Sequence, residues 1–119
     1  MKKGNTMAED TKAWFEEFGK SAAKVKEQIP NTINGFGGMF AKIMQDGAVS
    51  LKTKELIAVA IGVAIQCEPC IRLHVKKCLE VGCTKQEILE ATSVAVMMSG
   101  GPAYTHMPMV LDTIDGLQS

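Results

Sequence analysis

Two cysteines and a histidine stand close together in the segment "QCEPCIRLHVKKC", residues 66–78. Cys67 and Cys70 are three residues apart, and His74 follows four residues later. Pro69 predicts that a helix begins between the two cysteines, which places Cys70 in its first turn. A helix N-terminus stabilises a thiolate, and an imidazole four residues on lies on the same face, where it can accept the thiol proton. Cys67, just outside the helix, can close a reversible disulfide with Cys70.

Two other interpretations of these side chains stay open. They can pack as core residues, since cysteine often behaves as a small hydrophobe. Together with Cys78 they can instead bind zinc, although positions 70, 74 and 78 form a nearly straight stripe that converges poorly on one ion. Cys78 and Cys83 are predicted to be packing residues. His106, in the segment "GGPAYTH", is a weak further candidate.

Helical patterns run through the whole chain, and alternating strand patterns are absent. We therefore predict an all-α fold with about six helices, in one domain over residues 1–119 with a core at 30–115 and a flexible segment at 1–10. The capping-box spacing of "TKQE" marks one helix start, and "QDG" at residues 45–47 indicates a helix stop with a glycine cap. The predicted helices cover an amphipathic stripe at 14–29, then 30–45, about 51–66 with Ser50 as its cap, 69–82, 85–100 and 102–116. The helix at 30–45 carries the apolar residues Ile33, Phe36, Phe40, Ile43 and Met44.

The predicted helix at 51–66 has apolar residues all the way round, including the run "LIAVAIGVAI". Such a helix should be buried on nearly every side. A monomer of 119 residues buries only about two-thirds of its unfolded surface. We therefore expect an oligomer in which helices pack across subunits.

Composition excludes several classes of protein. Thirteen basic residues balance thirteen acidic ones, so no net charge favours nucleic acid or a membrane surface. The longest apolar run has ten residues, too few to cross a bilayer. No secretory signal is evident at the N-terminus, so we expect a cytoplasmic protein whose thiols are kept reduced. Four cysteines in that compartment favour catalysis or metal binding over a structural disulfide framework.

The spacing from Glu55 through Cys67 and Cys70 to His74 resembles a known signature. It matches the E-x11-C-x2-C-x3-H pattern of the alkylhydroperoxidase D-like branch of the carboxymuconolactone decarboxylase family. "DGAVSLKTKELIAVAIG" before the motif and "GGPA" after it look similar too, so the resemblance covers residues 30–115. It implies an all-helical fold that assembles into trimers or hexamers.

The resemblance also implies thiol peroxidase or disulfide reductase chemistry. Cys70 would be the attacking thiolate, Cys67 the resolving thiol, and His74 and Glu55 a proton relay. The substrate would be a hydroperoxide or a disulfide, and the electron donor a thioredoxin-like protein or a lipoyl-type dithiol. No cofactor or resident metal is expected.

The position of Glu55 leaves three alternatives open. In an antiparallel hairpin of the two central helices, Glu55 would lie about 9 Å along the axis from His74, a distance that two side chains and a water can bridge. The contact can instead cross a subunit boundary. Finally, Glu55 can be a first-turn residue that only interacts with the helix dipole.

Two other functions compete with the redox enzyme. A decarboxylase of the same family would act on a muconolactone-like acid and would need cations for the substrate carboxylates, of which only Arg72, Lys76 and Lys77 are near the motif. The third possibility is a non-catalytic helical oligomer that binds a metal or senses redox state through its cysteines.

Overall fold

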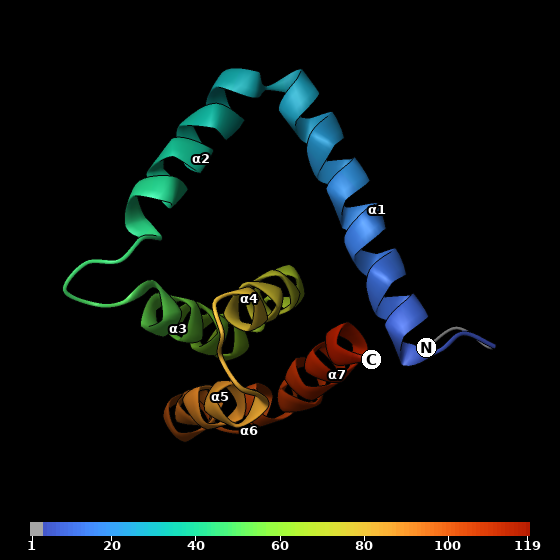
Figure 1. Ribbon diagram of the computed structural model, residues 1–119, viewed down its shortest axis with the longest axis vertical. Coiled ribbons are helices and arrows are strands. Elements are labelled where there is room, and N and C mark those ends of the chain that lie inside the picture. The colour runs from blue at the N-terminus through green and yellow to red at the C-terminus, as the bar shows by residue number, and fades with distance from the viewer. Residues whose placement is uncertain (1–3) are drawn as a thin grey trace.

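The computed structural model describes residues 4–119. This part of the chain is helical with no strand, which confirms the predicted all-α fold (Figure 1). Residues 1–3 of the segment predicted to be flexible lie outside the described residues, and α1 already begins at Met7. The helices are α1 (Met7–Gln28), α2 (Pro30–Ile43), α3 (Leu51–Ala64), α4 (Glu68–Glu80), α5 (Lys85–Ser99), α6 (Gly101–Tyr104) and α7 (Met107–Gln118).

Polar side chains start the helices where the sequence indicates a start. The Ser50 hydroxyl accepts the Thr53 N–H at α3, and Thr84 and Glu87 form the predicted capping box at α5. Thr6 caps α1 in the same way. Each cap satisfies backbone N–H groups that have no partner inside the helix, which stabilises the helix by roughly 1 kcal/mol.

The body of the molecule consists of α3, α4, α5 and α7. α3 packs against α4 and α5, and α7 packs against α1, α4 and α5. Burying each large aliphatic side chain contributes roughly 1.5–3 kcal/mol. The fully buried ones are Val59, Val63, Ile71, Val75, Ile88, Val110 and Ile114.

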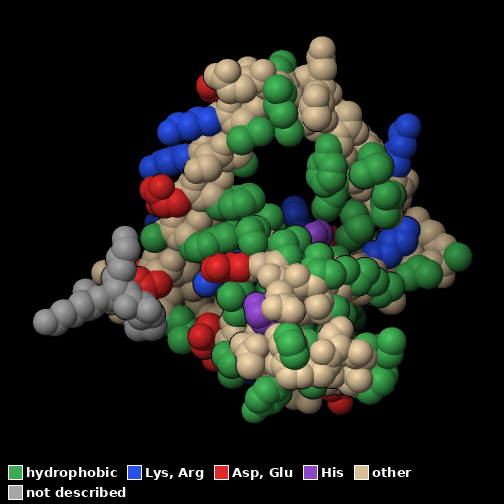
Figure 2. Space-filling view, turned by 180° about the vertical axis from the view of Figure 1, so that it is seen from behind, with side chains coloured by type: hydrophobic (Ala, Val, Ile, Leu, Met, Phe, Trp, Pro, Cys, Tyr) green, Lys and Arg blue, Asp and Glu red, His purple; other side chains and the backbone are tan. Residues whose placement is uncertain are grey.

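Residues 19–43, here called the arm, extend away from this body. Figure 1 shows the second half of α1 rising from α7 and α2 descending toward the start of α3. The predicted apolar stripes of these helices are therefore not buried in one chain, and residues 19–32 are exposed throughout. In the space-filling view the arm and the body enclose an opening bordered by hydrophobic side chains (Figure 2).

Two predicted helix ends differ from the structure. The helix expected at 102–116 is interrupted at Thr105–His106, because Pro108 has no backbone N–H to donate to a carbonyl of the preceding turn. The glycine cap expected in "QDG" is also wrong. α2 ends at Ile43, and Gly47 is not among the glycines with positive φ. The Lys54 ammonium instead donates to the carbonyls of Ile43 and Gln45, at 2.9 and 2.8 Å.

The α3 helix is not covered on nearly every side within one chain. Its buried residues form one face, whereas Ile57, Ile61 and Ile65 on the opposite side are 47–63% exposed. Together with α5 this side borders a wholly apolar groove of about 470 Å³. Among residues 4–119, no helix is both long and apolar enough to span a membrane.

Candidate functional site

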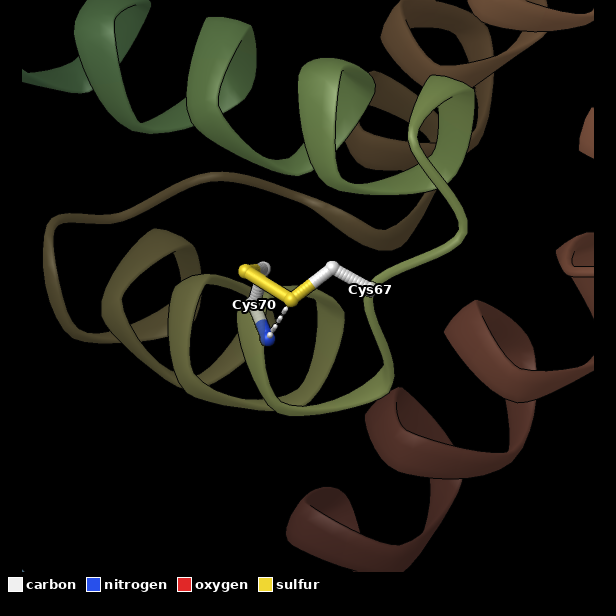
Figure 3. Close-up of a disulfide and its surroundings, with 2 residues drawn as sticks. All are labelled: Cys67 and Cys70. Atoms are coloured by element: carbon white, nitrogen blue, oxygen red, sulfur yellow. Dashed lines mark hydrogen bonds between the residues drawn. A yellow bond between two sulfur atoms is a disulfide. The ribbon is translucent and has the colours of Figure 1, made fainter.

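A disulfide joins Cys67 to Cys70 at the N-terminus of α4 (Figure 3). α3 ends at Ala64, and Gln66 turns the chain through a left-handed conformation with φ of 59°. Cys67 then becomes the N-cap of α4, and its Sγ accepts a hydrogen bond from the Cys70 N–H at 3.3 Å. Both cysteines are half-buried. The helix thus begins between them, as predicted, but the sulfur that receives a helix amide belongs to Cys67.

A close approach of α3 and α4 sets the position of this disulfide. Gly62 is buried in α3, and a Cβ added there would lie 3.2 Å from the Cys70 Cβ and 3.3 Å from the Ile71 nitrogen. These distances are tighter than most side-chain contacts allow. Glycine at position 62 therefore lets the two backbones approach where the Cys67–Cys70 turn begins.

Glu55 and His74 meet across the same pair of helices. The Glu55 Oε1 lies 2.7 Å from the His74 Nδ1, with the carboxylate side chain 4% exposed and the imidazole 18% exposed. The contact is direct and lies within one chain, so neither a bridging water nor a subunit boundary is needed. Glu55 also lies beyond the first turn of α3, which argues against a role limited to the helix dipole. When Glu55 is ionised it only accepts hydrogen bonds, and a neutral His74 paired with it donates from Nδ1 and keeps Nε2 as a proton acceptor.

The sequence profile of the carboxymuconolactone decarboxylase family matches residues 30–111. The chain belongs to this family. The match confirms the family predicted from the spacing of Glu55, the two cysteines and His74.

Relatives and solved structures of this carboxymuconolactone decarboxylase family protein agree with its fold. An uncharacterized protein of the cox locus of Paracoccus denitrificans is 46% identical over 77 residues, which are 62% of this chain and 69% of that relative. A family protein from Legionella pneumophila superposes with a TM-score of 0.87 at 31% identity, covering 92% of this chain and 98% of the other. A family protein from Thermotoga maritima is described as "possibly involved in antioxidative response". It superposes with a TM-score of 0.68 at 25% identity, covering 73% of this chain and 90% of the other.

In this family member Phe40 adds a contact that sequence reasoning missed. Its ring stacks on the His74 imidazole, with centroids 5.9 Å apart and planes inclined by 23°. The sequence indicated only that Phe40 belongs to the apolar stripe of α2. No pattern in the sequence pairs that stripe with α4, because the contact joins residues 34 positions apart.

Cys78 and Cys83 lie together at the other end of α4, in the core. The Cys83 N–H bonds the Cys78 carbonyl at 2.9 Å, and the Gly82 N–H bonds the Leu79 carbonyl at 3.2 Å, with Gly82 in the left-handed region. This is a Schellman arrangement, which places the side chains of Cys78 and Cys83 in contact. Burial raises the pKa of both thiols, which favours the protonated form over the nucleophilic thiolate. Both are packing residues, as predicted.

The remaining candidates from the sequence lie apart from this arrangement. Within the described residues no group of three or more histidines, cysteines and carboxylates could hold a metal ion, so the ligand set considered for zinc does not assemble. The His106 Nδ1 hydrogen-bonds the Pro102 carbonyl at 2.8 Å, which links α6 to the start of α7. The candidate site therefore consists of Cys67, Cys70, His74 and Glu55, with Phe40 against the imidazole.

Proposed function

We propose that this protein is a thiol-dependent oxidoreductase that reduces hydroperoxides, or disulfides, through a redox cycle of Cys67 and Cys70. The observation that carries the proposal is a pair of disulfide-linked cysteines at a helix N-terminus, one turn from an imidazole whose Nδ1 lies 2.7 Å from a buried carboxylate oxygen. A thiol needs a base or a lowered pKa to act as a nucleophile at neutral pH. His74 supplies the base, since residues four apart on a helix are neighbours.

The proposed reaction begins on reduced protein with transfer of the Cys70 thiol proton to the His74 Nε2. The Cys70 thiolate attacks one oxygen of the hydroperoxide, and the O–O bond breaks. Cys70 then carries a sulfenic acid, and the leaving alkoxide takes the proton from His74 and departs as an alcohol. Glu55 stabilises the imidazolium that exists between these two proton transfers.

Cys67 completes the oxidative half of the cycle. Its sulfur displaces the hydroxyl of the sulfenic acid, which leaves as water, and the Cys67–Cys70 disulfide forms. The Cys70 N–H that bonds the Cys67 sulfur stabilises that sulfur as a thiolate in this step. An external dithiol, from a thioredoxin-like protein or a protein-bound lipoyl group, then reduces the disulfide and is itself oxidised.

Decarboxylation of a muconolactone-like acid is the competing function within the family. The three cations near the motif are already engaged with other side chains. Arg72 bonds Glu68 at 2.9 Å and lies over the Trp14 ring, Lys76 lies over the Phe15 ring, and Lys77 pairs with Glu80. A substrate carboxylate would have to displace these partners, so this function ranks below the redox cycle.

Turnover of a panel of hydroperoxides, with a generic dithiol as reductant, tests the proposal. We expect dithiol-dependent consumption of peroxide in the wild type and loss of it in Cys70→Ala. Cys78→Ala removes a buried thiol that lies away from the disulfide, and this variant should still consume peroxide. Glu55→Gln keeps the shape of the side chain but removes its charge, and we expect it to slow turnover by about 100-fold. If the wild type consumes no peroxide and reduces no disulfide in this assay, the proposal is wrong.

A further inference from the structure

The α2 helix contacts the candidate site through Phe40. No residue of α2 is fully buried, and Phe36, Met39 and Ile43 are more than half exposed. Phe40 differs, because it is half-buried and its ring stacks on the His74 imidazole. Resting on the function proposed above, we propose that Phe40 is a positioning residue that fixes the plane of the His74 imidazole and shields its hydrogen bond to Glu55.

Two hydrogen bonds fix the end of α2 that carries Phe40. The Lys54 ammonium donates hydrogen bonds to the carbonyls of Ile43 and Gln45. These bonds satisfy backbone acceptors at the C-terminal end of α2 and place a positive charge where the helix dipole favours it. Lys54 immediately precedes Glu55 in α3. Two adjacent residues of α3 therefore act on the imidazole. Glu55 hydrogen-bonds it directly, and Lys54 holds the end of α2 that places the Phe40 ring against it.

The imidazole needs the contact with Phe40 because the hydrogen bond to Glu55 alone leaves the plane of the ring free to tilt. A single hydrogen bond at Nδ1 fixes one edge of the ring but not the angle of its plane. The offset-stacked Phe40 ring packs against part of the imidazole face and limits that angle, which in turn restricts the direction of the Nε2 lone pair. Phe40 also keeps water from one face of the imidazole, where water would compete for the Glu55 hydrogen bond.

A matched control lies one turn earlier on the same helix. Phe36 is 59% exposed, and its ring centroid is 6.3 Å from that of Phe40. Phe36→Ala removes the same number of atoms from the same face of α2 without removing the contact to His74. Phe40→Tyr keeps the ring and serves as the conservative variant.

Nitrogen-15 NMR of the histidine side chains tests the inference without any assay of activity. The chain has two histidines, so His106 serves as an internal reference. At a pH where both imidazoles are neutral, we expect one tautomer at His74 in the wild type, with the hydrogen on Nδ1. In Phe40→Ala we expect the His74 signals to move toward the average of two tautomers, with His106 unchanged. Phe36→Ala and Phe40→Tyr should match the wild type.

The rate of sulfenic-acid formation on Cys70 is the second measurement. We expect Phe40→Ala to slow it by about tenfold and Phe40→Tyr to restore it. Unchanged His74 signals in Phe40→Ala, or an equal change in Phe36→Ala, would overturn the inference. A wild type that reduces neither peroxide nor disulfide but shows the expected His74 signals would overturn the proposed function and leave the role of Phe40 standing.

Discussion

The two sulfurs of the Cys67–Cys70 pair have different surroundings. The Cys67 sulfur accepts a helix amide, whereas Cys70 lies one turn before His74 on the same helix. An attacking thiol needs a base to accept its proton, and in the proposed cycle the His74 imidazole is the base for Cys70. The amide on Cys67 instead suits a resolving or leaving thiolate. The sequence alone could not make this distinction, because it depends on which residue becomes the N-cap of α4.

Single serine variants should therefore differ in the first step. With peroxide and a sulfenic-acid trap, we expect Cys67→Ser to accumulate trapped sulfenic acid on Cys70 and Cys70→Ser to accumulate little. Mass spectrometry of the trapped peptides gives the measurement. In the wild type, mild oxidation should link Cys67 to Cys70 and leave Cys78 and Cys83 reduced. Trapping mainly on Cys67 in Cys70→Ser would reverse the assignment of the two thiols.

The buried thiols should make stability depend on alkaline pH. An unfolded chain loses a cysteine proton above about pH 8.5, whereas burial raises the pKa of Cys78 in the folded protein and keeps its proton bound. The unfolded state then binds fewer protons than the folded state, so stability falls as pH rises above about 8.5. Cys78 can contribute a slope of up to about 1.4 kcal/mol per pH unit.

Urea unfolding at several pH values, on reduced protein, measures this slope. Cys78→Ala should unfold more easily at neutral pH because of the small cavity that it leaves, and its stability should fall less steeply above pH 8.5. Equal slopes in the two proteins would show that Cys78 does not carry the effect.

At the scale of helices, local sequence signals predicted where most helices begin, but they predicted fewer of the helix ends. Ser50, Pro69 and the Thr84–Glu87 capping box act on backbone groups within four residues. The interacting residues are therefore close enough in the sequence for the pattern to reveal them. The cap of α2 could not be predicted in this way. It depends on Lys54, eleven residues from Ile43, and on the path of the loop between them.

The packing of α1 on α7 also depends on one residue that the sequence does not reveal. Gly116 in α7 is buried against the Thr11 side chain of α1, and an added Cβ would overlap that side chain. We expect Gly116→Ala to lower the free energy of unfolding by about 1–3 kcal/mol, because α1 must move away.

The control for this prediction is Gly19→Ala in the exposed part of α1, where no atom lies within 4 Å of an added Cβ. It should leave stability unchanged or raise it by up to about 1 kcal/mol, since alanine favours a helix. Combining Gly116→Ala with Thr11→Ala should recover part of the loss. A Gly116→Ala protein with the same free energy of unfolding as the wild type would contradict the close packing of Gly116 against Thr11.

Considered as a whole molecule, one chain exposes an unusual amount of surface. Its accessible area is 7479 Å², whereas a monomer of this mass typically exposes about 6,300 Å². The excess includes apolar side chains of the arm and of the α3–α5 groove. Large exposed apolar patches are typical of protein interfaces. The all-round apolar pattern of α3 led to the same expectation from sequence, although the pattern could not show which side of α3 is left uncovered.

We expect a homo-oligomer of at least three subunits, a trimer or a hexamer. Light scattering at micromolar concentration gives its mass. Ile61→Glu places a charge in the apolar groove and should produce smaller species, because burying an unpaired charge is costly. Gln86→Glu adds the same charge at an exposed position and should leave the mass unchanged. A wild-type monomer under these conditions would count decisively against the assembly.

The position of Trp14 gives this protein an optical signal of its own. It is the chain's only tryptophan, it lies under the Arg72 guanidinium, and it lines the same shallow depression as Glu68 and Pro69, the two residues between the cysteines. We expect that opening the Cys67–Cys70 bond shifts Glu68 and Pro69 and so changes the surroundings of that indole ring. Its fluorescence should therefore follow oxidation and reduction in real time, with no added dye or coupled enzyme.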